Sequence, residues 1–181
     1  MSEAELSLLK YCLTISASIS KDKVGTMRIA LGSDHAGFEL KTVLAKTLTD
    51  WGHETFDLGT DNATDSVDYP DFGAAVGRSV ASGDCDLGVA VCGSGIGISI
   101  AANKVPGVRA AAVHDVTSAH LAREHNHANV LCLGSRLIGS VVAIEALDAW
   151  LNATPAEGRH GARIVKLDDL DEHLVDHERL T

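Results

Sequence analysis

Two hydrophobic patterns alternate along this chain between residues 27 and 151. The first is a short apolar run without polar alternation, which predicts a strand buried on both faces of a sheet. The second is a longer segment whose apolar residues recur with the period of a helix. Strands are predicted over residues 28–31, 54–58, 87–91, 109–113 and 130–133, and helices over residues 37–51, 69–82, 95–103, 115–124 and 139–151.

Several predicted helices carry signals of their own. Leu40, Leu44 and Leu48 recur at helical spacing along one face. Pro70 falls in the first turn of its helix, where proline is tolerated, and Asp115 is a suitable N-cap. Beyond a polar stretch at 152–161, residues 164–174 are amphipathic and predict a last helix.

Alternation of strands with helices predicts the α/β class. We expect a three-layer α/β/α, Rossmann-like domain, in which helices cover both faces of a five-stranded parallel sheet. In such folds ligands bind at the carboxyl ends of the strands. The polar residues that follow each predicted strand are therefore the first candidates for a functional site.

The chain divides into three parts. Residues 1–26 form an N-terminal extension, which lacks the basic start and long apolar centre of a signal peptide and whose apolar part is too short to span a bilayer. Residues 27–151 form the α/β domain. Residues 152–181 form a C-terminal arm and helix, which we expect to pack on a partner subunit.

Composition narrows the class of partner. A formal net charge of -10 argues against nucleic acid or an anionic membrane as the main partner. It leaves open an anionic small molecule, which responds to local groups. Cys12, Cys85, Cys92 and Cys132 form neither a CxxC pair nor a zinc-finger spacing. Such cysteines favour reduced thiols in a cytoplasmic protein.

The most informative stretch follows the third predicted strand. Gly93, Gly95 and Gly97 stand at alternate positions between that strand and a helix. A strand, a glycine turn and a helix aim backbone N–H groups at an anion. Cys92 and Ser94 stand on the same turn, and a simple binding loop needs no thiol. We therefore expect the catalytic chemistry of the protein at this glycine turn.

Three better-known loops fit this sequence poorly. The dinucleotide fingerprint G-x-G-x-x-G fails because Ile98 occupies the place of its third glycine. Residues 32–37 have the spacing of a P-loop but lack the Lys-Ser/Thr that contacts phosphate. Ser94 lacks the flanking glycines of a nucleophile elbow. Nucleotide binding and serine hydrolysis are both disfavoured.

Each candidate residue also has an ordinary structural interpretation. A free cysteine is most often a small buried apolar residue, and Cys12, Cys85 and Cys132 are interpreted that way. Cys92 differs because a glycine turn before a helix stabilises a thiolate. His125 and His127 have the HxH spacing of a metal pair, but no third ligand is evident. Arginines are usually solvated; Arg136, Arg159 and Arg163 could instead bind a phosphate.

Together these residues resemble the ribose-5-phosphate isomerase type B family, which also holds galactose-6-phosphate isomerase subunits and tetrulose-phosphate isomerases. The resemblance covers about residues 27–165. The motifs that carry it are Gly32-Ser33-Asp34-His35-Ala36-Gly37, Asp68-Tyr69-Pro70, residues 92–104, Glu124-His125-Asn126, Asn129, Gly134-Ser135-Arg136 and Gly158-Arg159-His160.

The resemblance implies an aldose–ketose isomerase that needs neither a metal nor a cofactor. It implies that Cys92 is the base that carries a proton between two substrate carbons, that Ser94 assists it, and that His125 opens the sugar ring. It also implies a homodimer, or a dimer of dimers, with active sites shared between subunits. The residues implied to bind substrate are Asp34, His35, Tyr69, Gly93, Gly95, Ile96, Gly97, Asn126, Arg136, Arg159 and Arg163.

The sequence departs from the family pattern at its N-terminal extension, for which the resemblance implies no role. One branch of the family carries a catalytic glutamate on the helix after the glycine loop, where this chain has Ile98. The expected substrates are ribose 5-phosphate and ribulose 5-phosphate. A tetrulose 4-phosphate, an allose or galactose 6-phosphate, and a non-catalytic phosphosugar-binding role stay open.

Overall fold

The computed structural model describes residues 25–178. Most of the predicted extension, with Cys12, lies outside the described residues. Within them the strands form one parallel sheet in the order β2-β1-β3-β5-β4. The strands are β1 (Arg28–Ser33), β2 (Glu54–Asp57), β3 (Leu87–Cys92), β4 (Ala110–Ala112) and β5 (Val130–Gly134), and the helices are η1 (His35–Gly37), α2 (Phe38–Asp50), α3 (Tyr69–Ala81), α4 (Ile96–Ala102), α5 (Val116–Asn126), α6 (Ser140–Asn152) and α7 (Arg159–Glu178).

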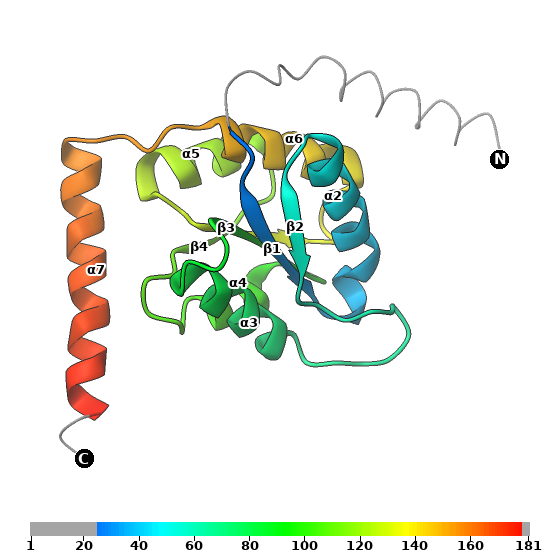
Figure 1. Ribbon diagram of the computed structural model, residues 1–181, viewed down its shortest axis with the longest axis horizontal. Coiled ribbons are helices and arrows are strands. Elements are labelled where there is room, and N and C mark those ends of the chain that lie inside the picture. Colours follow the sequence, from blue (N-terminus) through cyan, green and yellow to red (C-terminus); the bar gives the residue numbers. More distant parts are fainter. Residues whose placement is uncertain (1–24, 179–181) are drawn as a thin grey trace.

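Helices cover both faces of the sheet (Figure 1). Helices α2, α5 and α6 pack on one face, around the fully buried Leu44, Leu131 and Trp150. Helices α3 and α4 pack on the other face, around Val76 and Ile98. The apolar runs of β1, β3 and β5 are buried from end to end because both faces are covered. The predicted three-layer α/β/α fold is confirmed.

Two helix starts follow the signals predicted from the sequence, and a third has a cap that was not predicted. The Asp115 side chain accepts a hydrogen bond from the Ser118 N–H at 2.8 Å and caps α5. Pro70 stands in the first turn of α3. Asp34 caps the single turn η1 by accepting from the Gly37 N–H at 2.9 Å. The last of these caps holds a predicted site residue at the end of β1.

Helix α7 differs from its predicted bounds. The expected start at residue 164 is wrong, since α7 begins at Arg159, directly after Gly158 with its φ of +67°. The first turn of α7 is largely exposed, and a helical turn on the surface needs no apolar residues to mark it. The helix stands beside β4, outside the three layers (Figure 1).

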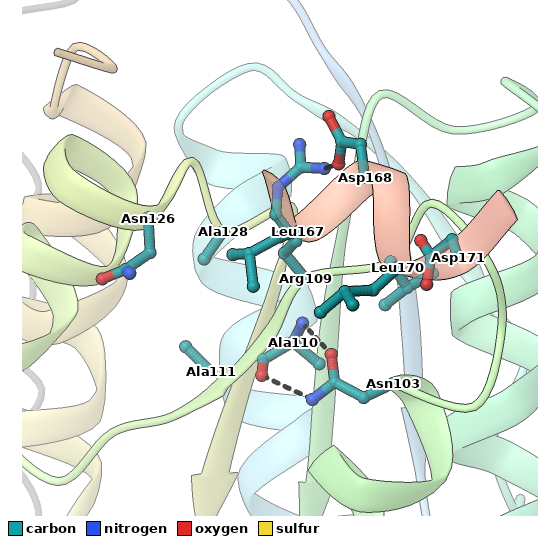
Figure 2. A pocket seen from close by; sticks show the side chains of 11 residues that line it. Asn103, Arg109, Ala110, Ala111, Asn126, Ala128, Leu167, Asp168, Leu170 and Asp171 are labelled. Carbon is teal, nitrogen blue, oxygen red and sulfur yellow. Dashed lines mark hydrogen bonds and ion pairs between the residues drawn. The ribbon is translucent and has the colours of Figure 1, made fainter. Parts of the chain in front are cut away.

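Two polar contacts attach α7 to the domain. Arg109 Nη1 lies 2.8 Å from Asp168 Oδ1, and the Gly107 N–H donates to Asp171 Oδ2 at 2.7 Å. Between α7 and β4 lies a hollow lined by these chain segments and by Asn126 (Figure 2). Among the described residues, no helix combines the length and apolar character needed to cross a membrane.

Candidate active site

The predicted ligand-binding edge is built from the ends of three adjacent strands. In the parallel register Ser33 of β1 pairs with Val91 of β3, and Cys92 of β3 pairs with Gly134 of β5. The segments that leave β1, β3 and β5 therefore start side by side. Ser135 joins them further, because its hydroxyl donates to the Ala36 carbonyl at 2.7 Å and its N–H donates to the Cys92 carbonyl at 2.9 Å.

Cys92 ends β3 with its thiol against the glycine turn. Its Sγ accepts a hydrogen bond from the Gly95 N–H at 3.2 Å, and the residue is 4% exposed. This hydrogen bond fixes the sulfur against the backbone of the turn. Ser94 Oγ accepts from the Ile96 N–H at 3.3 Å, at the start of α4. The turn thus presents a sulfur, a hydroxyl and several amides within a few residues.

Two side chains from elsewhere lie against this turn. A Cβ atom added at Gly93 would lie 3.4 Å from the Cδ, Nε and Nη1 atoms of Arg136. A Cβ added at Gly97 would lie 2.6 Å from Cζ of Tyr69. Arg136 is held in register because its own N–H donates to the Gly93 carbonyl at 3.0 Å. A guanidinium, whose fork of donors suits an anionic oxygen group, and a phenol ring therefore flank the glycines.

Asp34 and His35 lie at the adjacent strand end. His35 Nδ1 accepts a hydrogen bond from the Val67 N–H at 3.2 Å, in the loop that leads to α3. With Nδ1 acting as acceptor, the neutral imidazole carries its proton on Nε2 and can donate from there. Asp34 is nearly buried, and one of its oxygens caps η1. Both side chains are set by backbone hydrogen bonds rather than left free on a loop.

A buried lysine supports the segment that follows β2, and the sequence analysis did not predict it. Lys41 on α2 is 1% exposed, and its Nζ lies 2.6 and 2.7 Å from the two carboxylate oxygens of Asp57 and 2.8 Å from the Thr60 carbonyl. A buried ammonium needs such partners. Thr60 in turn donates its N–H to the Ser33 carbonyl at 3.1 Å. A lysine next to Leu40 and Leu44 on the apolar face of a helix was the signal available.

The remaining predicted residues form a second group around the end of α5 and the start of α7. The rings of His125 and His160 stack with their centroids 4.2 Å apart and an angle of 17°. Desolvation first, and then the charges of His125, Arg159 and Arg163, lower the pKa of His160. Asn126 ends α5 and borders the hollow beside β4. The structure therefore gathers two histidines and two arginines into one cationic cluster.

The two groups lie at opposite ends of the parallel strands: one at the carboxyl ends, called here the carboxyl edge, and the other at the amino ends, called the amino edge. Helix α5 starts after β4, at the carboxyl edge, and runs back to its last turn before β5 begins. Its last residues, His125 and Asn126, therefore lie at the amino edge. Cys92 lies at the carboxyl edge. Within a single chain, the structure does not bring His125 to Cys92.

The structure gives the HxH pair and Cys132 structural surroundings. The two histidines of the HxH pair have different partners: His125 stacks on His160, and His127 Nε2 lies 3.0 Å from the Ala156 carbonyl. Within residues 25–178, no group of three or more His, Cys, Asp or Glu side chains has a metal-binding arrangement. Burial, with a smaller effect from Cys92, raises the pKa of the Cys132 thiol well above its usual range. Cys132 therefore stays protonated and buried in the core.

Comparison with known proteins settles the family. A family model described as Ribose/Galactose Isomerase matches residues 29–167. The chain belongs to this family. It is 44% identical over 137 residues to the ribose-5-phosphate isomerase B of Escherichia coli strain K12, covering 76% of this chain and 91% of that protein.

Solved structures agree with this assignment. The ribose-5-phosphate isomerase B of Clostridium thermocellum superposes with a TM-score of 0.80 at 47% identity, covering 82% of this chain and 99% of that one. The Mycoplasma genitalium ribose-5-phosphate isomerase B with bound ribulose-5-phosphate has a TM-score of 0.77 at 40% identity, covering 80% and 96%. The Rossmann-like fold and the isomerase class predicted above are confirmed.

Proposed function

We propose that this protein interconverts ribose 5-phosphate and ribulose 5-phosphate through a cis-enediolate, with the Cys92 thiolate as the base. The observation that carries the proposal is the Cys92 sulfur, which accepts the Gly95 N–H in a glycine turn flanked by Arg136 and Tyr69. Membership of the family supports the isomerase class, and several relatives bear the name ribose-5-phosphate isomerase B.

The proton transfer follows from this geometry. In the open-chain aldose, the Cys92 thiolate removes the proton from C2, and the electron pair of that C–H bond forms the C1=C2 bond of the enediolate. The electron pair of the C1=O bond moves onto O1 at the same time. The thiol then returns the proton to C1, while the proton of the 2-hydroxyl passes to O1 and the C2=O bond forms, which gives the ketose. Amides of the 93–97 turn hold the negative charge that develops on oxygen. Removal of one such donor in other enzymes costs about 3–4 kcal/mol in transition-state stabilisation.

Other residues divide the remaining tasks. His125 opens the furanose ring by proton transfer at the ring oxygen, a role suited to an imidazole near neutral pH. Asp34 and Asn126 hold sugar hydroxyls, and Ser94 supports Cys92 or the substrate. The phosphate is held by one imidazole and three guanidinium groups: His35, Arg136, Arg159 and Arg163.

These assignments require a homodimer with shared sites. His125, Asn126, Arg159 and Arg163 lie at or near the amino edge of the sheet, and Cys92 lies at the carboxyl edge. In a two-fold dimer every contact between the subunits occurs twice. If the amino edge of one subunit faces the carboxyl edge of its partner, two equivalent sites form. We infer that the cationic cluster of one subunit completes the Cys92 site of its partner.

The test of the base is Cys92→Ala. This variant is expected to lose at least about a thousandfold in kcat for ribose 5-phosphate while keeping its thermal melting temperature, because general-base catalysis of this kind contributes roughly 10²–10⁴-fold. The matched control is Cys85→Ala, which removes a buried thiol outside the glycine turn. Wild-type protein in deuterium oxide is also expected to place deuterium on C1 of the ketose. Near wild-type turnover in Cys92→Ala would disprove the assignment.

Substrate length is the main alternative. The family description names both ribose and galactose, so a six-carbon phosphate such as allose or galactose 6-phosphate, or a tetrulose 4-phosphate, competes with the five-carbon substrate. An assay across such a panel is expected to give the highest kcat/KM for ribose 5-phosphate. Tight binding without turnover of any of them would favour a non-catalytic phosphosugar-binding protein.

A further inference from the structure

The stack of His125 on His160 joins the end of α5 to the start of α7. His125 lies in the last turn of α5 and His160 in the first turn of α7. Their ring centroids are 4.2 Å apart and their planes are inclined by 17°. Both residues are only partly buried, so core packing does not by itself hold either ring. The sequence motifs marked His160 only as a neighbour of Arg159.

The surroundings of the stack indicate that the His160 ring is uncharged. His160 Nε2 lies 3.3 Å from Arg159 Nε, which can only donate, so His160 acts as the acceptor and is neutral there. The lowered pKa of His160 also favours the neutral ring. His125 Nε2 lies 3.4 Å from Glu124 Oε2, which also contacts His120 at 3.4 Å. His160 therefore presents a flat, uncharged ring to His125.

We propose that His160 is a positioning residue for ring opening: its ring fixes the His125 imidazole in the orientation from which His125 transfers its proton. This inference rests on the proposed function. An imidazole at a partly exposed helix end samples several rotamers, and a stacked ring restricts them. Misplacement of a catalytic group by about 1 Å costs on the order of a hundredfold in rate.

A substrate that needs no ring opening separates this role from others. Ribose 5-phosphate is mainly a furanose, closed through its 4-hydroxyl. 4-Deoxyribose 5-phosphate lacks that hydroxyl and enters the site as an open-chain aldehyde, on which Cys92 can act directly. A residue that serves only His125 matters for the first sugar and not for the second. A residue that holds the phosphate or the fold matters equally for both.

The experiment measures kcat/KM on both sugars for four full-length proteins: wild type, His160→Leu, His160→Phe and the control His120→Leu. His160→Leu is expected to lose about ten- to a hundredfold on ribose 5-phosphate and less than about threefold on the deoxy sugar. His160→Phe keeps a flat ring and is expected to recover most of the lost rate. His120→Leu removes the other histidine beside Glu124 and is expected to match wild type on both sugars.

Other results of this experiment would contradict the positioning role of His160. An equal loss on both sugars in His160→Leu, no loss on either, or a His160→Phe variant as slow as His160→Leu would overturn the positioning role while leaving the isomerase intact. A wild-type protein inactive on both sugars would overturn the proposed function, and this inference with it.

Discussion

At the scale of single residues, the turn after β3 leaves no room for a side chain at Gly95. Gly95 has a φ of +77°, and a Cβ added there would lie 2.9 Å from the carbonyl carbon of Leu133. A Cβ added at Gly134 would lie 2.6 Å from the backbone of Ser94. The turns that follow β3 and β5 therefore touch backbone to backbone, and this contact sets the amide cradle beneath Cys92.

Gly95→Ala tests this contact. The left-handed φ and the backbone clash together are expected to lower the free energy of unfolding by about 2 kcal/mol or more. Activity is expected to fall beyond the loss of folded protein, since the Gly95 N–H contacts the Cys92 sulfur. Gly139→Ala is the control, because Gly139 has an ordinary φ of -77° and open space around an added Cβ. Urea denaturation and kcat of both variants give the comparison; equal stability of the two would contradict the packing argument.

At the scale of elements, a histidine joins the starts of β1 and β2. His53 precedes β2, and its Nδ1 accepts a hydrogen bond from the Met27 N–H at 3.3 Å, one residue before β1. Burial lowers the pKa of His53 below its ordinary 6.5. Protonation of Nδ1 would also remove the acceptor. The neutral form of His53 thus belongs to the folded state.

This arrangement predicts a pH dependence of stability. The unfolded chain takes up the His53 proton below pH 6.5, whereas the folded chain resists it. The stability contributed by His53 is therefore fully present above that value and lost as the pH falls through the lowered pKa. In His53→Gln, the difference in unfolding free energy between about pH 7.5 and about pH 5 is expected to shrink. His114→Gln, at an exposed histidine, is the control; an unchanged difference in His53→Gln would refute the coupling.

At the scale of the whole molecule, the predicted site residues are divided between two edges of the sheet. The thiol, the glycine turn, Tyr69 and Arg136 lie at one edge, and the cluster around His125 lies at the other. Helix α7, which supplies part of that cluster, leaves Val165 59% and Leu170 60% exposed. Apolar side chains exposed on an outlying helix are typical of a surface that meets another subunit.

Mixing two inactive variants tests the shared site. Cys92→Ala and His125→Ala dimers, dissociated and reassociated together, are expected to recover about a quarter of wild-type activity, since half of the dimers are hybrids and each hybrid holds one intact site. Each variant carried through the procedure alone is the control and is expected to stay inactive. Absence of recovery, with hybrids demonstrated by differently tagged chains, would place the site within one chain.

The amino-acid sequence determined the fold class and the chemistry of the turn. Unalternated apolar runs specify doubly covered strands, and every strand began within one residue of its predicted position, because glycines and capping residues act locally. The same local logic placed Cys92, Ser94 and the glycines together, since they are neighbours in the chain. It missed the surface start of α7, where no apolar stripe marks the helix.

Only the tertiary structure decided which distant residues meet. The bonding of Lys41 to Asp57, the stack of His160 on His125 and the contact of Tyr69 with Gly97 join residues far apart in sequence. Such pairings depend on how the layers close around the sheet, and no local pattern encodes them. The division of the candidate site between two edges has the same cause: the direction of α5 across the sheet carries His125 away from the thiol that stands at the other end.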